Sequence, residues 1–227
     1  STYGKVPSII VTLGMLFMTA SAFAASVGVS GTALYYSASG TETTKSSAEK
    51  NDKSDSGFAP MASVFVEQEL GTGVTVGLDV MPYSAKIGSG SMDKDDDAET
   101  SGTNKVDVNF KNHVTLYAEI PTDFGGIDGG FIKLGVHRVS LETDDVLSTG
   151  SKYGDEDING FMIGFGRKGD LANGGFFKIE GQVSRYGGAT FDAATGGNAA
   201  GDGSVFNKVE LDDFTTAGIK FSVGKAF

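Results

Sequence analysis

Cysteine is absent from this chain of 227 residues, and so is tryptophan. Without cysteine there are no disulfides, no thiolate metal sites and no cysteine nucleophile. Proline occurs 4 times and histidine 2 times, whereas glycine occurs 34 times. Basic residues are also few, 18 against 29 acidic ones, which gives a net charge of -11. A nucleic-acid partner is not expected, because phosphate binding needs clustered lysine and arginine.

Long hydrophobic runs are scarce as well, and the mean hydropathy of -0.07 argues against a protein built from membrane-spanning helices. The one apolar run covers residues 9–18 and leads to an A-x-A site formed by Ala22 and Ala24. A membrane span needs about 20 apolar residues, so this run is short for an uncleaved anchor. We therefore expect residues 1–24 to be a secretory signal peptide, cleaved after Ala24, and residues 25–227 to form the mature domain.

Alternation of apolar and polar residues with a period of two runs through the rest of the chain and predicts β-strands. The alternating segments are residues 25–37, 58–70, 74–86, 105–120, 130–143, 158–168, 175–186 and 208–227. Short connections between them alternate with long polar ones, as in membrane barrels with periplasmic turns and outward loops. The sequence thus predicts an all-β fold, an eight-stranded antiparallel up-and-down transmembrane β-barrel. The longest connection, residues 187–207, has room for an extra hairpin, which leaves ten strands as an alternative.

The three short turns allow a test of this prediction, because residues paired in a hairpin point to the same face. The expected pairs are Val66 with Leu78, Leu116 with Leu134, and Phe165 with Phe177. In each hairpin the apolar residues of the two strands coincide. A slip by one residue would break all of these matches.

The other face of the predicted strands is polar and carries charges of both signs. In a membrane barrel this face lines the lumen, which in an eight-stranded barrel is just wide enough for side chains. The expected lumen residues are Glu67, Glu69, Asp79, Asp107, Lys111, His113, Glu119, Lys133, His137, Lys178, Glu180 and Lys220. Unpaired buried charges are costly, so we expect an ion-paired plug. A water- or ion-conducting path is the alternative.

His113 and His137 lie equally far from the turn at Gly125 and are expected to face each other. Such a pair suits a metal site, a pH sensor or a simple hydrogen-bonded contact, and two ligands are too few for a closed metal site. The alternation stumbles at residues 137–139, which suggests a bulge. The chain has no G-x-S-x-G or zinc-binding helix motif, so we expect neither catalysis nor a cofactor.

Acidic residues recur at alternate positions in one of the long connections, at Asp93, Asp95, Asp97 and Glu99. The spacing is similar to a calcium-binding loop, but Ala98 stands where that loop needs glycine. We expect no metal site and interpret the stretch as an acidic surface loop.

The last strand, "AGIKFSVGKAF", resembles the C-terminal targeting strand of bacterial outer-membrane β-barrels. The residues that carry the resemblance are Gly218, Ile219, Phe221, Val223 and Phe227. Lys225 departs from the pattern, since the family more often has an apolar or aromatic residue there. The nearest architecture is the small eight-stranded group that includes the OmpA membrane domain and OmpX. The resemblance implies an outer-membrane location and recognition of the last strand by the barrel-assembly machinery.

The expected function is that of a non-enzymatic surface or structural barrel with a plugged lumen and four long acidic loops. The loops are expected outside the cell and both mature ends in the periplasm, where the first strand pairs with the last to close the barrel. Expected partners are outer-membrane lipid and lipopolysaccharide, with an extracellular ligand or phage for the loops. A porin-like channel for small solutes or cations is the alternative function. In place of tryptophan, tyrosines are expected in the interfacial girdle: Tyr35, Tyr36, Tyr83, Tyr117 and Tyr186.

Overall fold

The computed structural model describes residues 25–43, 50–83, 85–94, 102–124, 126–146, 152–153, 155–195 and 208–227. The strands are β1 (Ala25–Thr43), β2 (Lys50–Glu69), β3 (Thr75–Met81), β4 (Ala85–Lys94), β5 (Gly102–Pro121), β6 (Gly130–Val146), β7 (Lys152–Tyr153), β8 (Glu156–Asp170), β9 (Gly175–Tyr186), β10 (Ala189–Thr195), β11 (Lys208–Leu211) and β12 (Phe214–Ala226). A short 3-10 turn, η1, covers Ala172–Gly174. No helix in these residues is long and apolar enough to cross a lipid bilayer. The expected signal peptide, residues 1–24, lies outside them.

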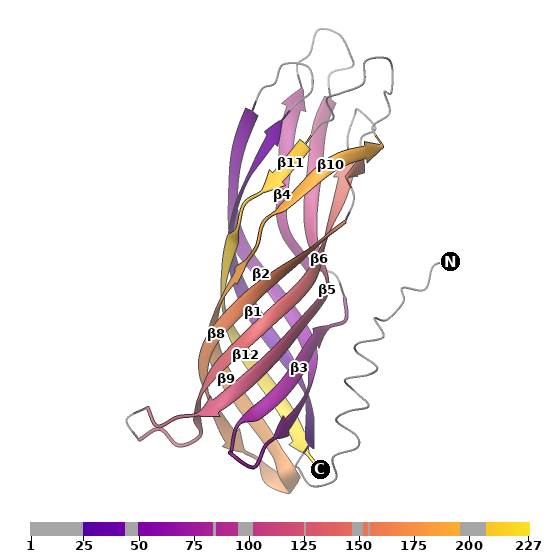
Figure 1. Cartoon of the computed structure of the whole chain (residues 1–227). Helices are drawn as coiled ribbons and strands as arrows, with labels where there is room; N and C mark the ends of the chain where they lie inside the picture. Colours follow the sequence, from indigo (N-terminus) through magenta and orange to yellow (C-terminus); the bar gives the residue numbers. More distant parts are fainter. Residues whose placement is uncertain are drawn as a thin grey trace, which may run out of the picture.

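Eight of the strands close into an antiparallel barrel in the order β12-β9-β8-β6-β5-β3-β2-β1 (Figure 1). The closure joins β1 to β12, from Ser26 opposite Ala226 to Ser37 opposite Thr215. It leaves no free edge around this part of the sheet. The eight-stranded barrel expected from the sequence is therefore confirmed, and so is the pairing of its first and last strands.

The remaining short strands lengthen the barrel at the end away from the C-terminus (Figure 1). β4 continues the line of β3 alongside β5. β10 and β11 continue the hairpin of β9 and β12, and β11 also pairs with β1. Within the described residues, the stretch 187–207 thus lengthens an existing hairpin and adds no further strand to the barrel.

The predicted loops were too long, because the strands continue well into them. β1 and β2 stay paired from Ala38 opposite Asp55 to Thr43 opposite Lys50, in a region assigned to a loop from the sequence. Backbone hydrogen bonds hold this part of the sheet together, whereas its side chains are polar on both faces, with Ser39 and Thr41 on one and Asp55 on the other. Apolar alternation therefore ends before the strands do.

Hairpin register was predicted correctly at one turn and wrongly at two. Val66 does lie opposite Leu78. Leu116, however, pairs with Val136, and Phe165 pairs with Gly181, which are shifts of two and four residues. Both shifts are even, so neither moves a side chain to the other face. The turn between β8 and β9 lies further along the chain than expected. In it the Leu171 amide donates to the Gly175 carbonyl at 2.7 Å.

A bulge lies in β5, between Lys111 and Val114, and not in β6 where the alternation stumbled. Its residue Asn112 has a positive φ of 54°, a left-handed conformation that asparagine tolerates better than most residues. The extra residue reverses the faces beyond it. As a result Phe110 is fully buried inside the barrel, while Lys111 turns outward.

The exterior of the lower barrel is an apolar belt. Its exposed members are Val27, Val29, Val64, Leu116, Leu134, Val136, Phe161, Ile163, Phe165, Ile179, Val183, Ile219, Phe221 and Val223. Tyr35 and Phe58 lie together at its upper edge, with ring centroids 5.2 Å apart. A band of this kind, with aromatic residues at its border, is the surface that a barrel presents to lipid.

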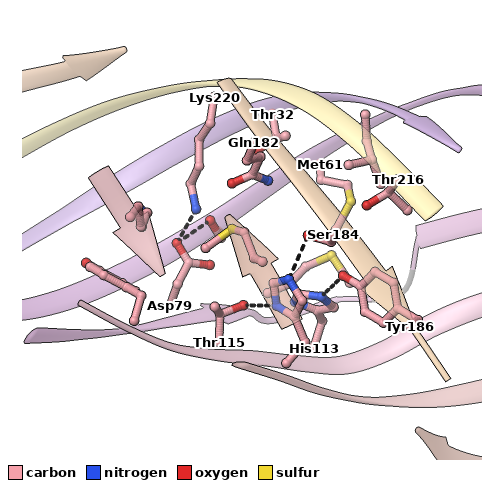
Figure 2. A pocket seen from close by; sticks show the side chains of 17 residues that line it. Thr32, Met61, Asp79, His113, Thr115, Gln182, Ser184, Tyr186, Thr216 and Lys220 are labelled. Carbon is pink, nitrogen blue, oxygen red and sulfur yellow. Dashed lines mark hydrogen bonds and ion pairs between the residues drawn. The ribbon is translucent and has the colours of Figure 1, made fainter. Parts of the chain in front are cut away.

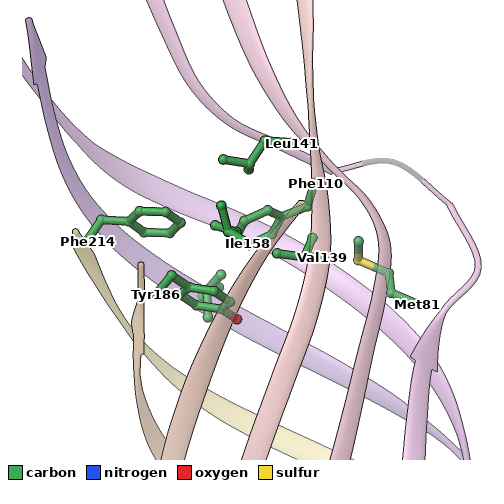
Figure 3. Close-up of a cluster of buried hydrophobic side chains, with 8 residues drawn as sticks. Met81, Phe110, Val139, Leu141, Ile158, Tyr186 and Phe214 are labelled. Atoms are coloured by element: carbon green, nitrogen blue, oxygen red, sulfur yellow. The ribbon is translucent and has the colours of Figure 1, made fainter. Parts of the chain in front are cut away.

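The upper interior is apolar, unlike the lower one. Eight buried side chains form this upper cluster: Leu34, Met81, Phe110, Val139, Leu141, Ile158, Tyr186 and Phe214 (Figure 3). They come from seven strands and meet inside the barrel above the polar residues. The Tyr186 and Phe214 rings stack with centroids 4.9 Å apart. The barrel is thus filled by side chains at two successive levels. The lower one combines charged groups with the buried rings of Phe65, Phe131 and Phe176, and the upper one is apolar.

Candidate functional site in the barrel lumen

The lower lumen is crossed by Lys178, which projects inward from β9. Its ammonium donates to Glu67 Oε2 on β2 at 2.7 Å and to Glu119 Oε2 on β5 at 2.9 Å. Neither strand is a neighbour of β9 in the barrel. These bonds therefore span the interior, and they tie three separate parts of the wall together.

Lys133 on β6 forms a second crossing. Its ammonium donates to both oxygens of Glu180 on β9, at 2.9 and 3.0 Å, and lies 3.4 Å from Glu119 Oε2. The same ammonium lies 4.1 Å from the centre of the Tyr117 ring. Tyr117 in turn donates its hydroxyl proton to Glu67 at 2.7 Å. Glu119 and Tyr117 thus join the two lysine crossings into one network.

A third crossing lies above these two. Lys220 on β12 donates to Asp79 Oδ2 on β3 at 2.6 Å, and Ser63 donates to the same oxygen at 3.1 Å. Ser30 and Ser222 form a neutral hydrogen bond of 2.7 Å in the adjacent wall. Each of these three buried lysines therefore has a carboxylate partner, as a low-dielectric interior demands.

Charges in this network do not cancel. Four carboxylates, Glu67, Asp79, Glu119 and Glu180, face three ammonium groups, which leaves one negative charge in excess. Glu67 Oε1 is buried and has no hydrogen-bond partner within the part of the chain that the structure describes.

The two histidines meet above the ion pairs, with ring centroids 4.8 Å apart. His113 Nε2 is hydrogen-bonded to the Tyr186 hydroxyl at 2.8 Å. His137 is bonded through Nδ1 to Thr115 at 2.7 Å and through Nε2 to Ser184 at 2.9 Å. Thr115, and not His113, is the backbone partner of His137, so the histidines meet across a diagonal.

The chain of Ser184, His137 and Thr115 has the spacing of a nucleophile, a base and an orienting group. The third member is a hydroxyl, however, where the orienting group of a serine hydrolase is a carboxylate. All three side chains are buried. The cavity beside them measures about 40 Å³ and cannot admit an acyl substrate. The arrangement acts as a hydrogen-bonded strut between β5, β6 and β9.

This cavity is bordered by Asp79, Lys220 and both histidines. Figure 2 shows the side chains of Asp79, Lys220 and His113 pointing into it. A space of about 10–15 Å³ on this measure holds one water, so the cavity has room for about three. It is too small for a solute or for an ion with its hydration shell.

The structure buries nine of the twelve residues expected in the lumen: Glu67, Asp79, His113, Glu119, Lys133, His137, Lys178, Glu180 and Lys220. Glu69 is exposed where β2 ends, and the side chain of Asp107 lies outside the described residues. The inward placement of Lys111 was wrong, because the bulge turns it outward to Glu142, 3.5 Å away.

For the acidic stretch, Asp95, Asp97 and Glu99 lie outside the described residues, as does the side chain of Asp93. Elsewhere in the described chain, no three histidine or acidic side chains are close enough to hold a metal ion.

Tyr117 and Tyr186 were expected in the interfacial girdle and are instead buried in the lumen, where they bond to Glu67 and His113. The alternation could have placed Tyr117 correctly, because it shares the polar face with Glu119 two residues on. The girdle prediction was based on the residue type alone and disregarded this alternation.

The last strand alternates as its motif requires. Ile219, Phe221 and Val223 are exposed on the outer face, and Phe227 is exposed just beyond the strand. Gly218 is half-buried on the inner face beside Lys220, whereas Lys225 is exposed on the outer face near the lower rim.

No protein-family model matches this sequence, and no curated protein matches it. Among solved structures, outer membrane protein OprG from Pseudomonas aeruginosa is similar at 13% identity over 89% of this chain and 96% of that one, with a TM-score of 0.48. The outer membrane protease OmpT from Escherichia coli is similar at 9% identity over 92% and 99%, with a TM-score of 0.46. The outer membrane protein AlkL gives 15% identity over 88% and 90%, with a TM-score of 0.44. The barrel assignment rests on the strand order and closure of this chain itself.

Proposed function

We propose that the protein is a non-conducting barrel of the bacterial outer membrane that supports an elongated surface structure. The lower barrel spans the membrane, and the end formed by β4, β7, β10 and β11 projects outside the cell. The end that holds the C-terminal residue Phe227 lies on the periplasmic side. The role is structural or interactive, and it includes no catalytic step.

The observation that carries this proposal is the filled lumen. Three lysine crossings occupy the lower interior, and the upper cluster occupies the next level. The cavity of about 40 Å³ left beside them has room for a few waters only. Eight-stranded barrels leave little more than the space that side chains fill.

Membrane placement is supported by the apolar belt around the lower barrel. The belt surrounds an interior that holds seven charged side chains, which is the reverse of a water-soluble barrel. The alternating last strand, with the exposed Phe221 and Phe227, suits recognition by the barrel-assembly machinery during insertion. Lipopolysaccharide would be the natural partner of the exterior just above the belt, and an extracellular ligand or phage that of the strand extensions.

Planar-bilayer recording of the purified full chain tests the closed lumen. We expect no stepwise openings in the wild-type protein. A variant that combines Lys178→Ala, Glu67→Ala and Glu119→Ala should stay closed as well, because the Lys220–Asp79 crossing and the upper cluster remain in place. Stepwise openings of the wild-type protein with cation selectivity would overturn the proposal in favour of a cation channel.

A further inference from the structure

Five soft donor side chains border the lumen cavity: the thioethers of Met61, Met81 and Met162 and the imidazoles of His113 and His137. They reach it from five strands, β2, β3, β8, β5 and β6. Figure 2 shows Met61 and His113 entering the same space. These residues are among 227 that include only 6 methionines and 2 histidines. Half of the methionines and both histidines therefore gather at one cavity.

Backbone pairing brings some of these donors side by side. Met81 is the direct partner of His113 across β3 and β5. Met162 lies opposite both Gly135, two residues before His137, and Ser184, which bonds to His137. Met61 packs against the upper cluster that contains Met81.

His113 is the imidazole best placed to bind a ligand. His137 uses both of its ring nitrogens in bonds to Thr115 and Ser184. His113 uses Nε2 in its bond to Tyr186, and within the described chain its Nδ1 has no hydrogen-bond partner. A ring held through one nitrogen while the other stays available is the arrangement typical of a metal-binding histidine.

The donor set selects a class of ion. Thioethers are soft, neutral ligands that favour Cu(I), and imidazole also suits copper, whereas Mg²⁺ and Ca²⁺ prefer carboxylate oxygens. The upper cluster borders this region with apolar groups, which disfavours a divalent ion that would have to shed tightly held water.

We propose that the cavity binds one soft monovalent cation, Cu(I), through the Met81 thioether and His113 Nδ1. Met61 and Met162 supply further sulfur donors. The bound ion links β3 and β5 at the level where the ion-paired interior gives way to the upper cluster. This site does not depend on whether the lumen conducts, and no electron transfer is part of it.

Titration of the full chain in detergent tests this site, using Cu(I) under anaerobic reducing conditions against a chromogenic Cu(I) chelator of known affinity. We expect one equivalent bound per chain, replaceable by Ag(I) and not by Zn²⁺ or K⁺. X-ray absorption of the copper-loaded wild-type protein should show sulfur and nitrogen neighbours. Failure to compete with the chelator, or a shell of oxygen alone, would overturn the proposal without any mutant.

Variants then assign the ligands. Met81→Leu keeps the side-chain volume and should weaken Cu(I) binding by at least about tenfold, as loss of metal-site contacts does. Ile158→Leu repacks the same cluster without touching a donor and should leave the affinity within about twofold. Undiminished binding by a Met81→Leu, His113→Gln double variant would place the ion elsewhere and contradict the assignment.

Discussion

The lower and upper halves of the barrel have opposite polarity, and β6 contains both patterns in one strand. In its lower half Lys133 and His137 face inward while Leu134 and Val136 face outward. Beyond residue 137 the inward side chains are Val139 and Leu141, whereas Arg138 and Ser140 face outward and bond to Asp157. The backbone continues through this point without a bulge in β6. The inward and the outward face of β6 both change polarity at this level. The cause is therefore a change in what surrounds the strand and not a change in its backbone.

One sheet is therefore stabilised by two different physical terms, one in each half of the barrel. Where lipid surrounds the barrel, burying an apolar side chain gives little free energy, because lipid is itself apolar. Ion pairs and hydrogen bonds across the lumen hold the walls together there. Where water surrounds it, burial of the upper cluster supplies the driving force, as in a soluble protein. On the proposed membrane placement, the level of the change marks the outer boundary of the membrane.

Loss of a central lysine should have the largest effect on this contrast. Lys178→Met leaves Glu67 and Glu119 buried with fewer partners, and breaking a buried pair costs about 3–5 kcal/mol. Urea unfolding of the barrel in lipid vesicles measures the loss. Lys225→Met is the matched control at an exposed position, and it should change the free energy of unfolding by less than about 1 kcal/mol. Equal losses in the two variants would contradict the network.

Truncation in the upper cluster should come next. Leu141→Ala opens a cavity among fully buried side chains, and such changes cost about 2–5 kcal/mol. We expect the loss of stability in the upper half of the barrel. Amide hydrogen exchange should become faster in β6 beyond residue 137 and in the part of β8 paired with it. Glu142→Ala, on the outward face, should leave exchange there nearly unchanged. Faster exchange at Lys133 and not in the upper half would contradict the division into two halves.

An arginine placed outside the barrel should distinguish lipid from water. Val136→Arg puts a charge into the apolar belt and should cost about 2–4 kcal/mol at the depth of the bilayer centre and less near its edge. Ser140→Arg, four residues further along the same face, should cost no more than about 1 kcal/mol. The measurement is the free energy of unfolding in vesicles, with the same pair compared in detergent.

The smallest effect is expected at the exposed ion pair of Arg138 and Asp157. Their contact is 3.4 Å and the side chains are 70% and 55% exposed. Surface pairs of this kind contribute about 0–1 kcal/mol. A double-mutant cycle with Arg138→Ala and Asp157→Ala should therefore give a coupling energy below about 1 kcal/mol. A value similar to that of the buried lysines would mean that this region is shielded from water.

Face assignments could be predicted from the sequence, whereas register could not. The period of two fixed which side of each strand carries charge, as for Lys133 and Glu180, because a strand must alternate. Shifts by two or four residues keep every face, so the pattern gave no warning that Leu116 pairs with Val136. Only the turn geometry distinguishes such registers.

Two other features were beyond the reach of the pattern. The bulge at Asn112 depends on a backbone conformation that many sequences could adopt, and it turned Lys111 outward. The apolar interior of the extension broke the assumption that one face stays polar along the whole strand. For this reason Val139 looked like an irregularity, although it is a regular inward position of β6, as is Leu141.

Spin labels along the outward face of β6 test directly whether the surroundings of the barrel change from lipid to water beyond residue 137. Labels at positions 134, 136, 138, 140 and 142 of the barrel in vesicles report collisions with oxygen, which enriches in lipid, and with a water-soluble nickel complex. We expect labels at Leu134 and Val136 to favour oxygen, and labels at Arg138, Ser140 and Glu142 to favour nickel. A lipid signature that continues through position 142, or a nickel signature already at position 134, would contradict the reversal of polarity in this barrel.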